Sequence, residues 1–379
     1  MKRIWISLLL LAFAATATTT AATPGNNTDN EKRYALYGVA FYNLENLFDT
    51  VHDYGKRDYE FLPDGTMNWG KMKYEAKLHN MAKVLSLLCT DKLRQGPAVI
   101  GVSEVENRRV LEDLTAQPAL RDRGLEIVHY DGPDRRGVDC AFLYNPRMFK
   151  LESSMLVPYY YLYKDRPDEE LLGFTTDADG RVTARTELLG DTTYITRGFL
   201  VMSGRLAGEK MHFIVNHWPS RAAGSEARER AGHQVRLLKD ALLRQDPGAK
   251  VVIMGDMNDD PDNKSMTTAL GCKRRTQDVK TDGELYNPWY DMLYKTGQGT
   301  LRYNGKWNLF DQIVFTGNLL GTDRSTLKFY RNEIFMRDWL FQQEGRYKGD
   351  PLRTHKSGVW LNGYSDHLPT MIYLVKEVE

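Results

Sequence analysis

The chain has 379 residues, and its 51 Lys and Arg residues nearly balance its 50 Asp and Glu residues, for a formal net charge of +1. This balance argues against a uniformly basic protein that coats nucleic acid, although it leaves room for a local basic patch. The only cysteines, Cys89, Cys140 and Cys272, are far apart and lack C-x-x-C spacing. This argues against a disulfide scaffold or a structural zinc site.

The N-terminal residues have the pattern of a secretory signal peptide. Two positive charges in residues 1–3 precede an apolar run over 4–14 and a cleavage triplet of small residues at 15–17. The apolar run is too short to span a bilayer comfortably. We therefore expect a signal peptide over 1–22, a disordered segment over 23–33 and one domain over 34–379. The mature protein is expected to be periplasmic or secreted, monomeric and not inserted in a membrane.

Strand and helix patterns alternate along the first half of this domain. In chain order they predict a strand at 37–42, an amphipathic helix at 69–88, a strand at 97–102, a short helix at 108–114, an extended segment at 125–129 and a strand at 138–144. The polar turn at 131–137 joins the last two segments in a hairpin-like arrangement. The sheet therefore need not be all parallel.

The second half continues the pattern, although residues 151–195 resist assignment. The remaining elements predicted are strands at 198–203 and 211–215, a helix at 225–243, and strands at 251–254, 309–315 and 370–375. Strands and helices in succession indicate a layered α/β domain.

Polar residues recur at the ends of the predicted strands. The apolar run Val251 to Met254 stops at Gly255, and Asp256 and Asn258 follow; in an extended chain both would point to the same side. The other clusters of this kind are Asn43, Glu104, Asn216 with His217, and Asp366 with His367. Strand ends of α/β sheets are a frequent location of functional sites, because loop residues there point into a common crevice.

Each cluster also has a structural explanation. Asp256 and Asn258 could form an Asx turn, Glu104 could cap the helix that begins near Arg108, and His217 or His367 could be a hydrogen-bonded structural histidine. Taken together, however, the clusters supply oxygen ligands for a hard cation and a histidine for proton transfer. This set suits metal-assisted attack on a phosphate ester.

Six motifs in order resemble the endonuclease/exonuclease/phosphatase superfamily. They are Asn43-Leu44-Glu45-Asn46, Ser103-Glu104-Val105-Glu106-Asn107, Asn216-His217-Trp218-Pro219-Ser220-Arg221, Gly255-Asp256-Met257-Asn258, Phe310-Asp311-Gln312-Ile313 and Ser365-Asp366-His367-Leu368-Pro369. The resemblance spans Asn43 to Pro369. It implies a four-layer α/β sandwich, in which two packed mixed β-sheets are flanked by helices, and a single catalytic domain.

The resemblance also implies a metal site. Glu104 is similar to the principal Mg²⁺ ligand, Asn43 helps to place the metal or the phosphate, and Asp366 shares the metal environment. Mn²⁺ or Ca²⁺ could replace Mg²⁺. His367 resembles the catalytic histidine, polarised by Asp311.

The remaining implied roles concern water and phosphate. Asp256 resembles the residue that orients or activates the attacking water, and Asn258 the donor to a phosphate oxygen. His217 resembles the second histidine of the deoxyribonuclease-like branch. In that branch a carboxylate orients this histidine, and the nearest candidate here is Asp139.

Arginines near these motifs are candidates for substrate binding. Arg136, Arg197 and Arg221 could contact phosphate through their planar donor forks, or they could form surface ion pairs.

The resemblance predicts a metal-dependent phosphoesterase, and its core site does not distinguish diesters from monoesters. A secreted nuclease acting on DNA or RNA is the first hypothesis, because His217 lies in the Asn-His-Trp context of the diesterase branch. The alternative is a phosphatase or phosphodiesterase acting on inositol phosphates or phospholipid head groups. A non-catalytic binding module is a third hypothesis, against which the full set of catalytic residues argues.

Overall fold

The structure is a computed structural model that describes residues 32–160, 166–186 and 195–378. The predicted signal peptide and all but the last two residues of the predicted disordered segment lie outside these residues. Strand β1 already begins at Arg33. Among the described helices, none is both long enough and apolar enough to cross a membrane.

The described residues form two six-stranded sheets. In spatial order the first contains β15 (Lys328–Ile334), β18 (Thr370–Val378), β1 (Arg33–Leu47), β2 (Val99–Val105), β4 (Asp139–Tyr144) and β3 (Glu126–His129). The second contains β11 (Leu285–Tyr286), β14 (Asp311–Thr316), β10 (Lys250–Asp256), β9 (Glu209–His217), β8 (Ile195–Leu206) and β5 (Phe149–Tyr160). Both sheets mix parallel and antiparallel pairs.

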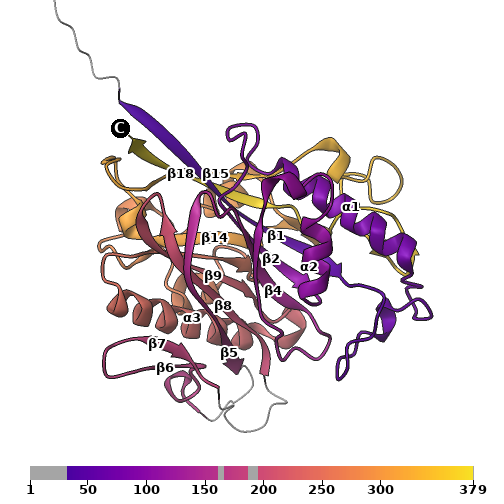
Figure 1. Ribbon diagram of the computed structural model, residues 1–379, viewed down its shortest axis with the longest axis horizontal. Coiled ribbons are helices and arrows are strands. Elements are labelled where there is room, and N and C mark those ends of the chain that lie inside the picture. The colour runs from indigo at the N-terminus through magenta and orange to yellow at the C-terminus, as the bar shows by residue number, and fades with distance from the viewer. Residues whose placement is uncertain (1–31, 161–165, 187–194, 379) are drawn as a thin grey trace, which may run out of the picture.

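Helices cover the outer faces of the two sheets (Figure 1). Helices α1 (Lys71–Leu87) and α2 (Arg108–Thr115) lie beside the first sheet, and α3 (Ser225–Gln245) lies along the second. The order helix, sheet, sheet, helix confirms the predicted four-layer sandwich. The smaller elements are α4 (Tyr290–Thr296) and three hairpins, β6 (Phe174–Thr176) with β7 (Val182–Ala184), β12 (Leu301–Tyr303) with β13 (Lys306–Asn308), and β16 (His355–Lys356) with β17 (Val359–Trp360).

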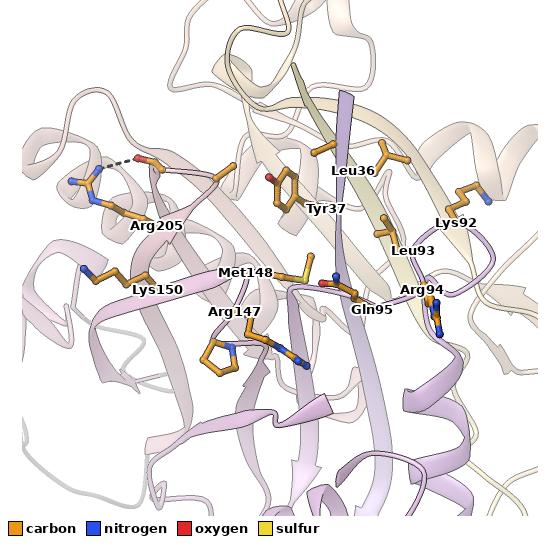
Figure 2. A pocket seen from close by; sticks show the side chains of 14 residues that line it. Leu36, Tyr37, Lys92, Leu93, Arg94, Gln95, Arg147, Met148, Lys150 and Arg205 are labelled. Atoms are coloured by element: carbon orange, nitrogen blue, oxygen red, sulfur yellow. Dashed lines mark hydrogen bonds between the residues drawn. The ribbon is translucent and has the colours of Figure 1, made fainter. Parts of the chain in front are cut away.

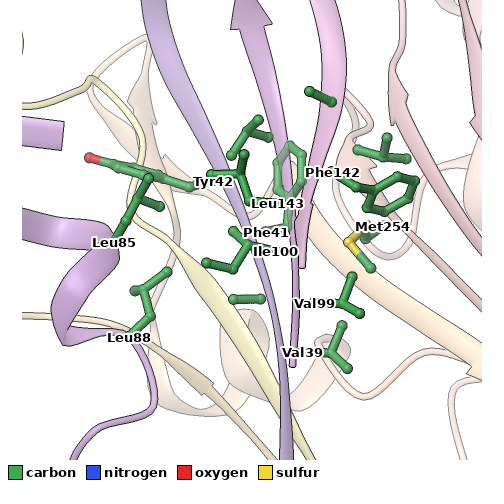
Figure 3. Packing of buried hydrophobic residues seen from close by; sticks show 14 of the residues in the cluster. Val39, Phe41, Tyr42, Leu85, Leu88, Val99, Ile100, Phe142, Leu143 and Met254 are labelled. Atoms are coloured by element: carbon green, nitrogen blue, oxygen red, sulfur yellow. The ribbon is translucent and has the colours of Figure 1, made fainter. Parts of the chain in front are cut away.

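Strand β10 shows why these strands have continuous apolar sequences. Val252 and Met254 belong to the large core that includes the space between the sheets, whereas Val251 and Ile253 pack in a second core with residues of α3. Because both faces of the strand are buried, residues 251–254 are all apolar. Figure 3 shows the corresponding division around β1, with Leu85 and Leu88 on one side and Val99 and Met254 on the other.

The patterns predicted the long elements well, and their boundaries moved by a few residues. The predicted helix at 69–88 is α1, and the helix at 225–243 is α3. The hairpin-like arrangement is confirmed, since β3 and β4 pair antiparallel. The unassigned stretch 151–195 contributes most of β5, which pairs along its length with β8.

The register of the strands gathers the polar motifs at one edge. Parallel β1 and β2 place Asn43 beside Ser103, and parallel β9 and β10 place His217 beside Asp256. Antiparallel β14 begins at this edge, where Asp311 pairs with Asp256. Antiparallel β18 also begins there, at Thr370, three residues after His367. Strand ends of both polarities therefore contribute to one site.

Candidate active site

The centre of the site is a set of buried polar groups that join the two sheets. The Asn43 amide nitrogen donates to Glu104 Oε1 at 3.2 Å and to Asp256 Oδ2 at 3.1 Å. The same two carboxylate oxygens lie 3.7 and 3.6 Å from His217 Nε2. The second oxygen of Glu104 accepts from the backbone N–H of Asn46 at 3.0 Å. Two carboxylates from different sheets therefore face each other at short range.

The backbone is left-handed at several of these positions. The φ angles are 47° at Glu45, 54° at Asn46, 61° at Glu104 and 51° at Asn258. Non-glycine residues rarely adopt this conformation, and when they do they concentrate at functional sites. Asn258 therefore does not continue the strand, as simple alternation had suggested; its N–H donates to Asp256 Oδ1 at 2.9 Å. The Asx turn formed by Asp256 and Asn258 is therefore part of the candidate site.

Helix capping does not explain Glu104. Asn107 is the N-cap of α2, and its side chain accepts from the Val110 N–H at 3.1 Å. The Glu104 carboxylate points instead into the polar cluster at the strand ends.

His367 is held by a buried carboxylate. Its Nδ1 lies 2.7 Å from Asp311 Oδ2, and its Nε2 lies 3.8 Å from Asp256 Oδ2. The Ser365 hydroxyl accepts from the His367 N–H at 3.1 Å and donates to the Asn43 carbonyl at 2.7 Å. Burial lowers the pKa of His367, but the Asp311 and Asp256 carboxylates outweigh this effect and raise that pKa well above its usual value.

Asp256 is also strongly perturbed. Burial raises its pKa to about 7, and the neighbouring Asp311 and Glu104 carboxylates act in the same direction, against the attraction of His367. Ligand atoms of Asp256, Asp311 and His367 all lie within 4.8 Å of one another, close enough for a metal ion. Asp311 Oδ1 is buried without a hydrogen-bond partner among the described residues.

His217 pairs with an arginine. Arg197 Nη1 lies 3.1 Å from His217 Nδ1 and 3.2 Å from Nε2. Burial, followed by the charges of Arg197, Arg136 and His367, lowers the pKa of His217 well below its usual value. The structure does not bring Asp139 to this histidine. Asp139 instead accepts from the Gly132 N–H at 3.0 Å and lies 3.4 Å from His129 Nε2.

The predicted link between Asp139 and His217 failed because of the local register. Asp139 opens β4 beside Val105, and its side chain is used to hold the turn that follows His129. On the Arg197 side of the pair the neighbouring carboxylate is Asp134, whose Oδ2 lies 3.6 Å from Arg197 Nε. Asp134 lies in the polar turn, and nothing in its sequence context distinguished it from its neighbours.

Asp366 belongs to a network that the sequence did not suggest. Its Oδ2 lies 2.9 Å from Arg353 Nη2, and Arg353 Nε donates to Glu45 Oε1 at 2.7 Å. The buried Lys77 ammonium donates to the Thr354 hydroxyl at 2.6 Å, in the same loop. Burial and the nearby Asp366 raise the pKa of Glu45 to about 7, although Arg353 opposes this shift. Arg353 lies in a loop without a motif, so no sequence signal marked it.

The predicted arginines line one cavity of about 460 Å³ with the catalytic candidates. Arg136, Arg197 and Arg221 share it with Glu104, Asp256, Asn258, His217, Asp366 and His367. Each arginine also has a carboxylate within 4.0 Å. The three arginines therefore form ion pairs and line the cavity at the same time. Two further residues contact the lining residues: Asn43 hydrogen-bonds to Asp256, and Asp311 hydrogen-bonds to His367.

The cavity has an apolar side that the sequence did not suggest. It is formed by Leu301, Tyr303 and Phe310. The Arg221 guanidinium lies 4.3 Å from the Phe310 ring centre and 5.4 Å from that of Tyr303. Asn258 also lines the cavity, and its amide nitrogen donates to the Trp218 carbonyl at 3.0 Å.

This fold, with carboxylates, histidines and arginines at one sheet edge, is that of a phosphoesterase. The chain belongs to the Endonuclease/Exonuclease/phosphatase family, whose sequence model matches residues 38–172 and 174–376. A comparison with curated protein sequences gave no match.

Solved structures share the fold over nearly the whole chain. A protein of the same family from Bacteroides thetaiotaomicron is 15% identical, with a TM-score of 0.50, and covers 92% of this chain and 98% of its own. A mannosyl-6-phosphatase from Bacteroides thetaiotaomicron VPI-5482 is 14% identical, with a TM-score of 0.51 and coverage of 89% and 99%. ANGEL2, a 2′,3′-cyclic phosphatase, is 12% identical, with a TM-score of 0.53 and coverage of 93% and 100%. At these identities the likeness shows the fold alone.

Proposed function

We propose that the protein is a metal-dependent phosphoesterase that hydrolyses phosphodiesters, as an exported nuclease. The observation that carries the proposal is the composition of the cavity, where Glu104, Asp256 and Asp366 meet three arginines and two histidines. Carboxylates can hold a cation, and arginine forks match phosphate oxygens. A binding protein would not require both sets together with a buried Asp311–His367 pair.

The donor set fits a hard divalent cation such as Mg²⁺. Glu104 and Asp256 present oxygen atoms to the same amide and imidazole, and their mutual repulsion favours a cation between or beside them. Glu104 and Asp366 would hold the cation, and Asn43, whose amide nitrogen donates to Glu104 and Asp256, would help to place it. When bound, it would neutralise charge on the phosphate oxygens and lower the pKa of water.

The residues of the chain divide the remaining work. Asp256, which lines the active-site cavity, accepts the proton of the attacking water. His367, oriented through Nδ1 by Asp311 and favoured in its protonated form by the neighbouring carboxylates, presents its Nε2 side to the cavity, where it donates a proton to the leaving oxygen as the P–O bond breaks. Arg197 and Arg221 bind non-bridging oxygens, and Asn258 lies beside them. His217, flanked by Arg197, contacts the phosphate as a neutral imidazole.

A diester is favoured because side chains lie on both flanks of the residues that are proposed to bind the phosphate. Arg136 lies on one flank, and Leu301 and Tyr303 supply an apolar flank that suits an organic substituent. The N-terminal signal pattern supports export, where extracellular DNA or RNA would be the substrate. A monoester of an inositol phosphate or a phospholipid head group is the second candidate. It is favoured by the neighbour of His217 Nδ1, which is Arg197 Nη1 at 3.1 Å, whereas the deoxyribonuclease-like pattern expects a carboxylate that orients this histidine.

A substrate panel tests the proposal. Plasmid DNA, RNA, inositol phosphates and phospholipid head groups would each be incubated with Mg²⁺, Mn²⁺ or Ca²⁺, and with chelator. We expect nucleic acid to be cleaved in a cation-dependent manner by the native protein and not by His367→Ala. Release of phosphate from monoesters only would favour the second candidate. No hydrolysis of any substrate with any cation would refute the enzymatic proposal.

A further inference from the structure

A second cavity, of about 650 Å³, opens at the end of the sheets opposite the active site. It is bounded by the start of β1, the loop after α1, the turn between β4 and β5 and the turn between β8 and β9 (Figure 2). From Tyr37 to Asn43, β1 extends about 20 Å at roughly 3.3 Å per residue. The cavity is therefore separate from the catalytic residues.

The floor of this cavity is apolar. Leu36, Tyr37, Leu93 and Met148 line it, and each of them is only half-buried. Figure 2 shows Tyr37 and Met148 on one side of β1 and Leu36 and Leu93 on the other, around the first residues of the strand. Apolar surface that is exposed together in a concave site marks a place where a ligand can be bound.

The rim of the cavity is cationic. Its five charged lining residues are all basic: Lys92, Arg94, Arg147, Lys150 and Arg205. Two have acidic partners outside the cavity, since Arg205 pairs with Glu152 at 2.9 Å and Lys92 with Glu333 at 3.3 Å. In the described part of the chain, Arg94 and Lys150 have no ion pair within 4.0 Å.

The strand register adds to this excess of charge. Lys150 and Arg205 are directly opposite each other in the antiparallel pair of β5 and β8. Like charges in this position repel each other and destabilise the pair. Glu152 offsets Arg205, and it also lies 2.7 Å from Lys210 Nζ, so it is shared. A negative group above Lys150 would relieve the repulsion.

We propose that this cavity binds an amphipathic organic anion, whose apolar body lies on Leu36, Leu93 and Met148 and whose carboxylate or phosphate head lies between Lys150, Arg147 and Arg205. Lysine and arginine remain charged over the physiological range, and the arginine fork suits both kinds of head. An inorganic anion alone would leave the apolar floor exposed. The proposal is independent of the reaction at the other end of the sheets.

The test uses 1-anilinonaphthalene-8-sulfonate, a fluorescent anion with an apolar body, on the full-length mature protein. We expect one binding site, and at least tenfold weaker binding in Lys150→Glu, because the substitution reverses an unpaired charge on the rim. Lys348→Glu is the matched control: this lysine is exposed and distant in sequence from the cavity. Tyr303→Ser, which changes the apolar side of the active-site cavity, should leave the probe bound.

Displacement distinguishes the kind of ligand. Dodecanoate and dodecyl phosphate should displace the probe, and the stronger competitor identifies the head that the rim prefers. Inorganic phosphate at the same concentration should not displace it. Equal binding by the native protein and Lys150→Glu would refute the proposal, as would displacement by inorganic phosphate alone or loss of the probe in Tyr303→Ser. Hydrolysis of phosphate esters by Lys150→Glu should equal that of the native protein.

Discussion

Replacing Asp311 with asparagine is expected to lower kcat about a thousandfold while the fold is preserved. The Asp311 carboxylate lies 2.7 Å from His367 Nδ1, and both side chains are buried. Asparagine can still accept the hydrogen bond, so the substitution removes mainly the charge. Two charges about 4 Å apart at an effective dielectric constant of about 20 interact by about 4 kcal/mol. At about 1.4 kcal/mol per tenfold change in rate, this corresponds to about three powers of ten.

The assay is hydrolysis of bis(p-nitrophenyl) phosphate with saturating Mg²⁺, combined with thermal unfolding to verify the fold. Asp311→Asn, His367→Ala and the double variant form a cycle. Because Asp311 acts through His367, the double variant should be no slower than His367→Ala alone. A rate for Asp311→Asn within threefold of the native rate would refute the reasoning, and so would additive losses in the double variant.

Three further outcomes are expected. Glu104→Gln should raise the Mg²⁺ concentration for half-maximal activity at least tenfold. An unchanged Mg²⁺ titration would show that Glu104 is not a metal ligand. Gly101→Ala should lower the free energy of unfolding by about 1–3 kcal/mol in urea, because its Cβ would lie 2.5 Å from Met254 Sδ between the sheets; a neutral effect would show that the sheets can move apart. Burial lowers the pKa of His212 to about 4, against the attraction of Asp246. The unfolded chain then takes up a proton between pH 6.5 and 4 that the folded chain does not. Stability should therefore fall by up to about 3 kcal/mol as the pH falls through that window, and an equal fall in His212→Gln would contradict this.

The sequence predicted those parts of the fold and site that depend on local patterns. Helices α1 and α3 were marked by long amphipathic repeats, and β10 by a continuous apolar run, because both of its faces are buried. The polar residues at strand ends came together because the parallel pairs β1–β2 and β9–β10 end side by side at the same edge. The ordered motifs were sufficient to identify the family.

Contacts between distant loops were not predictable in this way. Arg353 reaches Asp366 and Glu45 from a loop without a motif, so its position depends on the tertiary fold. Asp139 was assigned to His217 from its sequence neighbourhood, and the register of β4 turned it toward His129. Asn258 left the strand through a left-handed backbone conformation that simple alternation does not anticipate. Each of these differences arises where irregular backbone meets the site.

The most direct test of the proposed activity is the initial rate of bis(p-nitrophenyl) phosphate hydrolysis across a Mg²⁺ titration, measured for the native protein and for His367→Ala. We predict a saturable, chelator-sensitive rate for the native protein and a rate at least about a thousandfold lower for the variant, as expected when a positioned proton-transfer group is lost. Equal rates for the two proteins, or a rate that chelator does not change, would contradict the assignment of the cavity as a metal-dependent phosphoesterase site.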